Sequence, residues 1–577
     1  MKRLCNRWGG CCDNKGVLAL LIILTIWLFV VILFPLVELL LRSLHDENGV
    51  WIGLRNFYIF LSTPSFFSTF GNTLSVSLLT ALMSTVVGFF FAYGLTRTNI
   101  VGKGFFKTIA LAPLFTPSIM HGIALIYLFG NQGLITTGFF GVFSGIKIPL
   151  YGFWGILIAE FFYVFPKAVI IMTMTLLMAD MRLYDVAKTL GAGKIKEFFF
   201  ITLPEVRFGI MSAFFVTFTL VFTDFGVPKA IGGQFNVLAV DIYKKVIGEQ
   251  NFSMGATISL ILLFPTFLMF LVDRIVSKKK TSVVSSRAKP YKIKSNRFRD
   301  AVFLFGNLSI SFAVIVMLGV VVFASLVKSW PYDISVSFKN FATFNSVGND
   351  VVQTFSNSIK MAFLSAGIGS VVIFLAAWIV ERQKTAPILR KIIGSLSLFP
   401  TAIPGTVIGV AFIFFFNRQE FHLFGFSFFN SFSCLYGTIA ILVIVNIVHF
   451  MPVSFLTATT ALKKLDKEFE EVAHSLGVSS WKLFRSVILP ITLPALLEMF
   501  SYLFVSSITT ISALIFLYAP PFKPLAVELV DMEDAGNTSI AASLSVLILL
   551  TNVVVRILYL FISKQIRKHS KKWLLED

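Results

Sequence analysis

The sequence predicts an all-α polytopic membrane protein, with about 12 transmembrane helices arranged as two parallel six-helix repeats. Of its 577 residues, 56% are hydrophobic and only 14% are charged, whereas soluble domains average about 25% charged residues. The apolar residues occur in blocks of twenty or more, which is the length of helix needed to cross a ~30 Å hydrocarbon layer. No segment shows the period-two alternation of a membrane β-barrel strand. The second half of the chain also repeats motifs of the first half, as set out below.

Twelve apolar segments are long enough to be spans. In the first half they are Val17–Leu41, Thr73–Leu95, Phe106–Leu128, Tyr151–Leu177, Gly209–Val227 and Gly255–Val276. In the second half they are Ala301–Val327, Ile359–Val380, Ile392–Phe416, Cys434–Ala458, Ala495–Leu517 and Ile540–Ile562. The first span carries one charge, Glu38, and is too long for the core of a signal peptide, so we expect it to be retained.

The basic residues orient the chain in the membrane. Most of the 49 Lys and Arg fall in the loops that an even count of spans places on one side, and this bias marks the cytoplasmic side of an inner membrane. We therefore expect both termini in the cytoplasm, and we interpret the net charge of +20 as topological, without nucleic acid as a partner. The basic linker at 277–300 separates a first half at 1–276 from a second half at 301–577. It is either a patch for membrane lipid or regulation or a solvated tether, and we favour the tether.

The halves are related by an internal repeat. Asp185-Val-Ala-Lys-Thr-Leu-Gly191 is echoed 286 residues later by Glu471-Val-Ala-His-Ser-Leu-Gly477, and Leu203-Pro204 by Leu489-Pro490. Because each half has six spans, the repeats enter the membrane in the same direction and are related by an axis along the membrane normal. This symmetry predicts a transport path between the halves.

The repeated loop predicts a short amphipathic helix. Asp180 can cap a helix whose Leu183, Val186, Ala187 and Leu190 form one apolar face, and Gly191 suits the left-handed turn that ends it. In the second half the same roles fall to Asp466, Phe469, Val472, Ala473, Leu476 and Gly477. The apolar face must pack either on its own bundle or on another protein, and periodicity alone leaves both open.

The spacing of this loop resembles the EAA loop of permease subunits of binding-protein-dependent ABC importers. The matching residues are Asp185, Ala187, Gly191, Ile201, Leu203 and Pro204, and again Glu471, Ala473, Gly477, Val487, Leu489 and Pro490. The sequence departs from the pattern at Val186 and Val472, which replace alanine, and at Asp185, which replaces glutamate. The resemblance implies that each loop is a coupling helix that docks on one of two cytoplasmic ABC ATPase subunits. It also implies an external solute-binding protein that delivers a small solute.

The chain itself is expected to be no enzyme and to hold no cofactor, metal or catalytic residue. A phosphate-binding loop needs Gly-x-x-x-x-Gly-Lys-Ser/Thr, and the nearest approach, at 191–194, lacks both the spacing and the hydroxyl. ATP and magnesium would therefore bind the partner ATPase. Cys5, Cys11 and Cys12 show no paired metal-ligand spacing. A twelve-span secondary transporter is the main rival class, but it gives no reason for two such loops, and a membrane enzyme would need convergent His, Asp or Glu in one loop.

Fused two-half permeases resemble those of the ferric-iron and 2-aminoethylphosphonate importers. Four stretches look especially like the 2-aminoethylphosphonate group: Tyr127-Leu-Phe-Gly-Asn-Gln-Gly133, Thr223-Asp-Phe-Gly-Val-Pro-Lys229, Gly233-Gln-Phe-Asn-Val-Leu-Ala239 and Thr509-Thr-Ile-Ser-Ala-Leu-Ile-Phe516. We take 2-aminoethylphosphonate as the first cargo hypothesis and ferric iron as its alternative. Iron would prefer hard oxygen ligands, and no cluster of carboxylates and tyrosines is evident within the predicted spans.

A few polar residues inside the predicted spans are candidates for the translocation path. Charges at mid-bilayer are costly and usually face the protein interior or a water path. Glu160 and Lys167 lie two helical turns apart, so they either pair with each other or line the path. Asp224 precedes Gly226 and Pro228, where we expect the backbone to unwind, and Thr509 is the remaining candidate. Lys229, Lys244 and Lys245 in the next loop are positioned to receive an anionic group.

Overall fold

The computed structural model describes residues 13–283, 291–293, 295–342, 351–423 and 426–573. Within them the chain is almost wholly helical, which confirms the predicted fold class. Among these residues, ten helices are long and apolar enough to cross a membrane, and two further bent helix pairs would make twelve spans if each pair is one span. The only strands in these described residues form two hairpins, β1 (Val327–Ser329) with β2 (Asp333–Val336) and β3 (Glu420–Leu423) with β4 (Phe426–Phe429). Cys5, Cys11 and Cys12 lie outside the described residues, as does part of the basic linker.

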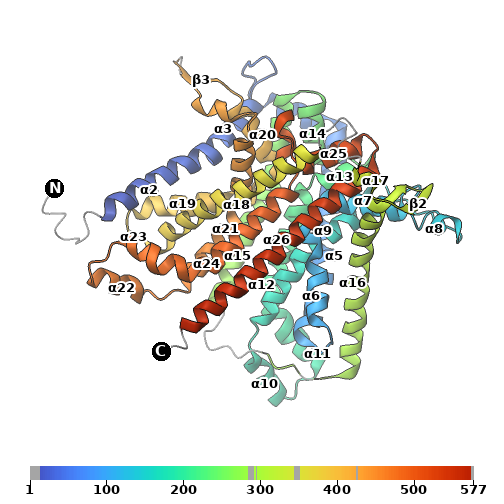
Figure 1. Cartoon of the computed structure of the whole chain (residues 1–577), viewed down its shortest axis with the longest axis horizontal. Helices are drawn as coiled ribbons and strands as arrows, with labels where there is room; N and C mark the ends of the chain where they lie inside the picture. Colours follow the sequence, from blue (N-terminus) through green and yellow to red (C-terminus); the bar gives the residue numbers. More distant parts are fainter. Residues whose placement is uncertain (1–12, 284–290, 294, 343–350, 424–425, 574–577) are drawn as a thin grey trace. The chain divides into compact units, whose positions relative to one another are not determined.

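The chain forms two compact units, whose segments can be located in Figure 1 from the colour bar of residue numbers. Unit 1 comprises Met1–Ser43, Val351–Val527 and Leu550–Asp577, and unit 2 comprises Leu44–Asp350 and Glu528–Leu549. The first predicted span thus belongs to the unit built mainly from the second half, and the seventh belongs to the unit built mainly from the first half. The two compact units therefore do not coincide with the two halves of the sequence. The division of the chain at the linker 277–300 stays a prediction about the sequence repeat.

Unit 2 is built around a pair of closely packed core helices. These are α5 (Pro64–Arg97) and α9 (Phe153–Leu177), and α12 (Leu203–Thr223) packs against both. Gly88 of α5 lies where a Cβ atom would come within 2.8 Å of the Ala168 Cβ on α9, whereas a Cβ at Gly71 in the same helix would meet nothing within 4 Å. Small residues at such a crossing let two backbones approach closely, which is how helices associate in lipid.

The other elements of unit 2 surround this core. They are α4 (Arg55–Ser62), α6 (Lys103–Leu111), η2 (Ala112–Phe115), α7 (Ser118–Phe129), α8 (Gly138–Gly141), α10 (Met181–Thr189), α11 (Lys194–Glu197), η3 (Phe198–Thr202), α13 (Gly226–Ile231), α14 (Leu238–Tyr243), η4 (Lys244–Gly248), α15 (Phe252–Val283), α16 (Arg297–Leu326) and α17 (Lys339–Ala342). The seventh span, α16, packs against α5, α6 and α7. Its Asn307 amide lies where a Cβ on Gly94 of α5 would come within 2.6 Å, so the two helices are in close contact.

Unit 1 repeats the same core. Its helices α18 (Val351–Arg382), α21 (Ile439–Lys463) and α24 (Leu489–Thr509) pack together. The other elements are α2 (Asp13–Leu28), η1 (Phe29–Leu33), α3 (Phe34–Ser43), α19 (Pro387–Leu398), η6 (Phe399–Ala402), α20 (Gly405–Phe416), η7 (Ser431–Leu435), α22 (Glu468–Ser475), α23 (Ser480–Leu483), η8 (Phe484–Ile488), η9 (Leu514–Phe516) and η10 (Pro520–Phe522). Two helices, α25 (Leu525–Asp534) and α26 (Thr538–Trp573), have residues in both units.

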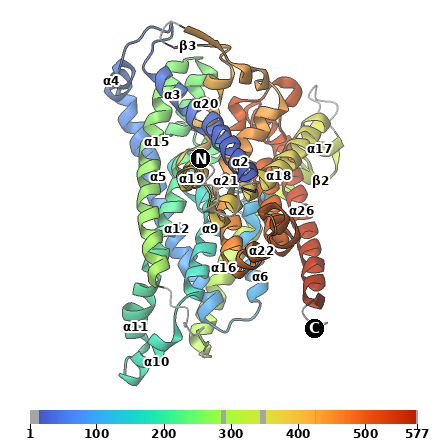
Figure 2. The same cartoon turned by 90° about the vertical axis from the view of Figure 1, so that its left-hand side faces the viewer.

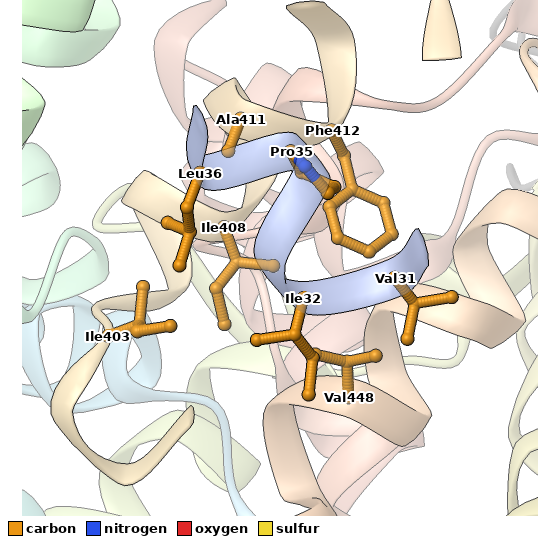
Figure 3. Close-up of a pocket in the computed structure, with 9 residues that line it drawn as sticks. All are labelled: Val31, Ile32, Pro35, Leu36, Ile403, Ile408, Ala411, Phe412 and Val448. Atoms are coloured by element: carbon orange, nitrogen blue, oxygen red, sulfur yellow. The ribbon is translucent and has the colours of Figure 1, made fainter. Parts of the chain in front are cut away.

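The first span is held in unit 1 by an apolar seam and one ion pair. Figure 3 shows the seam, in which residues of η1 and α3 face residues of α20, α21 and the turn before α20 around a space of about 10 Å³. Beside it the Glu38 carboxylate, 11% exposed, pairs with the Arg418 guanidinium at 2.5 Å. This pair accounts for the single charge of the first span, because a buried carboxylate needs such a partner.

The third span of each half is bent, a feature that the predicted spans Phe106–Leu128 and Ile392–Phe416 did not specify. The segment Lys103–Phe115 meets α7 at 104°, and Pro387–Ala402 meets α20 at 115°. Each break falls just before a proline, Pro117 or Pro404, which are the residues that precede α7 and α20. Proline pushes the residue before it out of the helical region, and Thr116 and Ile403 are indeed extended.

Candidate functional site

The first repeated loop contains the amphipathic helix that the sequence predicts. In Figures 1 and 2, α10 lies at the lower end of unit 2, below α12. The Asp180 carboxylate accepts a hydrogen bond from the Arg182 backbone N–H at 3.1 Å, which confirms the predicted N-cap of α10. The Arg182 guanidinium also pairs with Asp180, at 2.6 Å. An N-cap satisfies one of the backbone donors that a helix start leaves free.

The apolar face of α10 is exposed. Leu183 is 51% exposed, Val186 55% and Leu190 80%, and Ala187 is half-buried. The side of α10 that faces unit 2 carries Tyr184 instead, which is buried. In the described residues the face does not pack on its own bundle, so a partner is needed to remove it from water.

A left-handed glycine ends α10. Gly191 has φ +74°, and the N–H of Ala192 donates to the Ala187 carbonyl at 2.9 Å, so the predicted turn is confirmed. A Cβ at Gly191 would meet no atom within 4 Å, so the backbone conformation alone calls for glycine. The chain then continues through α11 and η3 into α12, where Leu203 is the first residue and Pro204 lies in the first turn. Thr202 has helical backbone angles, so Pro204 lies within a continuous helical segment, directly after the π-helical turn η3.

The second loop repeats this geometry. Phe469, Val472 and Leu476 on and just after α22 are 41%, 56% and 72% exposed, whereas Ala473 is buried. Gly477 has φ +67°, and a Cβ there would also meet no atom within 4 Å. The elements that follow, α23, η8 and α24, occur in the same order as α11, η3 and α12, so Leu489 and Pro490 open α24 as Leu203 and Pro204 open α12. We call α10 and α22 the loop helices.

The fifth span of each half ends earlier than predicted. The expected spans Gly209–Val227 and Ala495–Leu517 stop being helical after Thr223 and Thr509, at the extended residues Asp224 and Thr510. The predicted unwinding at Asp224 is therefore confirmed. The Asp224 carboxylate accepts the Val227 N–H at 2.9 Å and so begins the short helix α13.

Glu160 and Asp224 meet inside unit 2. Glu160 is fully buried in α9, and its carboxyl group lies against that of Asp224, which also interacts with the Ser118 hydroxyl. Lys167 does not form an ion pair with Glu160; its ammonium lies 4.3 Å from the centre of the Tyr163 ring. The result is a polar cluster of two carboxyl groups with a cation nearby, at a depth where charge is costly.

Sequence reasoning missed His121, Ser118 and Tyr163 as neighbours of this cluster. The buried His121 ring packs edge-on against Tyr163, with centroids 6.0 Å apart, and its Nδ1 lies 3.2 Å from the Ser118 carbonyl. A signal was present, because Ser118 and His121 lie one turn apart just after Pro117. It could not be used without knowing that the third span bends there.

The equivalent positions of unit 1 carry neutral groups. Asn446 is the counterpart of Glu160 in the repeat and is also fully buried, and neither atom of its amide has a hydrogen-bond partner among the described residues. Thr510 occupies the position of Asp224. The neighbouring candidate Thr509 is half-buried, and its hydroxyl donates to the Val505 carbonyl of its own helix at 2.9 Å.

The three lysines expected near Asp224 are engaged elsewhere. Lys229 pairs with Asp534 at 2.9 Å, Lys245 pairs with Glu249 at 2.7 Å, and Lys244 donates to the Asn236 side chain.

Beside Lys229, burial and the adjacent Asp534 carboxylate raise the pKa of Glu533 to about 7, and the Lys229 ammonium opposes that rise. This carboxyl group lies outside the candidate spans. It therefore changes charge near neutral pH, unlike an ordinary glutamate.

No group of three or more His, Cys, Asp or Glu side chains that could hold a metal ion occurs in the described part of the chain.

Comparison with known proteins gives a consistent set of relatives. The family model described as "Binding-protein-dependent transport system inner membrane component" matches twice, at residues 84–282 and 369–568. The chain is 26% identical to the ferric transport system permease protein FbpB of Actinobacillus pleuropneumoniae, over 92% of this chain and 75% of the relative. It is also 26% identical to the putative ferric transport system permease protein FbpB 1 of Haemophilus influenzae, over 87% and 78%. The spermidine/putrescine permease PotC of Escherichia coli matches at 23% identity over 43% of this chain and 89% of the relative.

Proposed function

Because the chain belongs to the family of binding-protein-dependent transport system inner membrane components, with one copy of the family model in each half, we propose that it forms the whole translocation path of an ABC importer. It is an ABC importer permease in fused two-half form, integral to the inner membrane. The secondary-transporter alternative is set aside by the double family match. The polar cluster of Glu160 and Asp224, with Lys167 nearby, is proposed to line the path in unit 2, and Thr509 in unit 1.

We further propose that each loop helix docks on one ATPase subunit, so that two copies bind one chain. The observation that carries this proposal is the pair of exposed apolar faces, centred on Val186 and Val472 at equivalent positions. Exposed apolar patches on a folded protein mark surfaces that bind partners. ATP and magnesium would act on those subunits, which places the loop helices and both termini in the cytoplasm and the solute-binding protein on the opposite side.

The test is to place a charge in each apolar face. Val186→Glu and Val472→Glu should each weaken retention of the ATPase, and the double variant should abolish it, because a carboxylate cannot be buried unpaired in an apolar cleft. Val101→Glu is the control, since Val101 is 84% exposed and lies outside the loop. The measurement is ATP hydrolysis by the affinity-purified complex, with the ATPase identified by mass spectrometry. Equal activity in all four proteins would reject docking through these helices.

For the cargo we propose ferric iron. The support is the similarity over most of the chain to two proteins named as ferric transport permeases, and the two carboxyl groups of the cluster are the hard oxygen ligands that such a cation prefers. The relatives named above lend no support to 2-aminoethylphosphonate, and the three outer lysines that would receive its anionic group are already paired.

Uptake of radioactive iron into cells that carry the complete importer tests this choice. Ferric iron should be taken up in an ATP-dependent way, and an excess of 2-aminoethylphosphonate should not compete. Glu160→Gln should reduce uptake without loss of the bound ATPase, because it removes a carboxyl oxygen from the path and leaves the loops intact. ATP-dependent uptake of labelled 2-aminoethylphosphonate, with no uptake of iron, would reverse the assignment.

A further inference from the structure

The second span of each half ends at a buried arginine. Arg97 is the last residue of α5, and Arg382 is the last residue of α18. Arg97 is 2% exposed and the Arg382 side chain 5%. Arginines at the ends of spans are ordinarily explained by the preference of basic residues for the cytoplasmic side of the membrane. That preference does not require the arginine side chain to be buried.

Arg382 ties three elements of unit 1 together. Its guanidinium makes two contacts with the Glu470 carboxylate on the loop helix α22, at 2.5 and 2.7 Å. The same group donates to the carbonyls of Leu465 and Asp466, at 3.2 and 2.8 Å, just beyond the end of α21. A bidentate arginine–carboxylate pair fixes geometry as well as position. The end of α18, the end of α21 and the loop helix are therefore held by one side chain.

Arg97 makes the equivalent contact in unit 2 with different chemistry. It donates to the Leu176 carbonyl near the end of α9 at 2.8 Å. Its guanidinium lies 5.5 Å from the centre of the Tyr184 ring on the loop helix α10, and 3.9 Å from the ring of Tyr291, a residue of the linker between the halves. The Tyr184 hydroxyl is fixed by Thr202 at 2.9 Å. Arginine over an aromatic face is attracted by the ring quadrupole.

The two contacts occupy the same place in the repeat. Tyr184 and Glu470 are separated along the chain by the same offset as Gly191 and Gly477, which end the two loop helices. Each lies on the side of its helix that is turned away from the exposed apolar face, so a loop helix has a partner-facing side and an arginine-facing side. The difference is that unit 1 uses an ion pair where unit 2 uses two cation–π contacts, one with Tyr184 and one with the linker residue Tyr291.

We propose that Arg97 and Arg382 are positioning residues that transmit movement of the loop helices to the core helices α5 and α18. This proposal rests on the proposed function, because it requires an ATPase that moves the loop helices. Movement of α22 acts through Glu470 on its bidentate ion pair with Arg382, the last residue of α18. Movement of α10 reaches α5 through aromatic contacts, and these also attach the linker to the same arginine.

A distance measurement that needs no cargo tests this transmission. Cys5, Cys11, Cys12 and Cys434 are first replaced by serine. One pair of spin labels is placed on the loop helices outside their apolar faces, at Thr189 and Ser475, and a second pair on the core helices, at Val86 and Val371. All four label sites are exposed, and each pair matches across the repeat. Distances are measured by electron–electron double resonance in the complex with its ATPase, before and after trapping with ATP and vanadate.

In the unmodified protein both label pairs should change distance on trapping. With Tyr184→Ala and Glu470→Ala together, the loop pair should still change and the core pair should lose its change. Glu468→Ala is the matched control, because Glu468 lies on the same loop helix, is exposed, and has no ion pair within the described residues. It should leave both changes intact. Retention of the loop-pair change also shows that a variant is folded and docked.

An exchange between the halves gives the sharper test. Tyr184→Glu places the carboxylate of unit 1 beside Arg97 and should restore the core-pair change that Tyr184→Ala removes, with a greater sensitivity to salt. If the core pair still changes fully in the double alanine variant, the arginines do not transmit the movement. If neither label pair changes distance in the labelled protein without further substitutions, the ATPase does not act on the loops, and the proposed function and this inference both fail.

Discussion

The two loop helices end at glycines whose backbone conformation an L-amino acid rarely adopts, and this makes a quantitative prediction possible. Gly191 and Gly477 have φ values of +74° and +67°, and a Cβ at either position would meet no atom within 4 Å. Alanine there introduces no clash, so its whole cost is conformational. The left-handed region costs an L-residue about 1–2 kcal/mol relative to glycine. Since about 1.4 kcal/mol is a factor of ten, the equilibrium ratio of the correctly ended loop to its alternatives should fall about 5–30-fold.

The expected result is a weaker complex with the ATPase. If docking needs the ended helix, the apparent dissociation constant rises by up to the factor by which that conformation is depopulated. Gly191→Ala and Gly477→Ala should each show this rise when ATPase binding to the purified permease is titrated, and their effects should multiply in the double variant.

The matched control lies two residues further on. Gly193 has φ −71° and precedes α11 as its N-cap, and its equivalent in the second loop is Ser479, whose hydroxyl caps α23. Gly193→Ser copies what the second loop already contains and should leave the dissociation constant unchanged. If Gly191→Ala and Gly477→Ala bind the ATPase as tightly as Gly193→Ser does, the loop geometry is not what the ATPase recognises.

Three further predictions concern stability, measured by thermal and denaturant unfolding in detergent micelles. The pKa of Glu533 is raised to about 7 from 4.5, so between these values the folded form holds a proton that the unfolded form releases. The stability of the wild-type protein should therefore fall from about pH 5 to pH 7. Glu533→Gln should flatten this profile and raise the stability by at most about 3 kcal/mol at pH 8, and an unchanged profile would refute the assignment. Glu38→Gln should cost about 1–3 kcal/mol by weakening a charged hydrogen bond to Arg418, whereas in an Arg418→Ala background the same change should cost much less, and full additivity would mean that the pair contributes nothing. Gly88→Ala should lower the stability by about 1–3 kcal/mol, because it overpacks the contact between α5 and α9. Gly71→Ala in the same helix should raise the stability by up to about 1 kcal/mol through helix propensity. Equal effects of the two variants would show that α5 and α9 are not closely packed at Gly88.

Hydropathy and the internal repeat predicted most of the architecture, because hydropathy is read from neighbouring residues and the repeat from similar residues at a constant spacing. The helical class, the spans and the loop helices follow from blocks of apolar residues and from the period of Leu183, Val186 and Leu190. The left-handed ends at Gly191 and Gly477 followed from the position of glycine after a periodic segment. Each of these features is decided by neighbours in sequence.

The features that escaped prediction depend on contacts between distant segments. The first and seventh spans are apolar on most sides, so nothing in their own sequence says which core they join. The bends before Pro117 and Pro404 had a local signal, yet a hydropathy window averages across it and returns one straight span. Glu160 and Lys167 were correctly placed on one helix. The carboxyl group beside Glu160 is that of Asp224, from the extended segment between α12 and α13, because the bend and the unwound end bring α7, α9 and α13 together.

The two arginines were hidden by a simpler explanation. A basic residue at the end of a span satisfies the topology rule by itself, so Arg97 and Arg382 gave no reason for further attention. What distinguishes them is burial and the pairing with Tyr184 and Glu470, which only the folded chain provides.

The repeat also separates what the backbone requires from what chemistry requires. The left-handed glycines, the prolines that open the fifth spans and the breaks after Thr223 and Thr509 occur in both halves, because one helical architecture must be built twice. The polar groups differ: Glu160 matches Asn446, Asp224 matches Thr510, and Tyr184 matches Glu470. A fused chain is free to vary these side chains independently in its two halves, whereas two identical subunits would have to carry the same residue twice. One acidic pair per path, instead of two, limits the charge that must be held in the membrane, where each ionised group costs several kcal/mol unless it is compensated. Asn446→Glu tests this reasoning directly: a second buried acid should lower the stability of the permease at neutral pH by more than Glu160→Gln does, and an unaffected melting temperature would show that unit 1 tolerates the charge that it lacks.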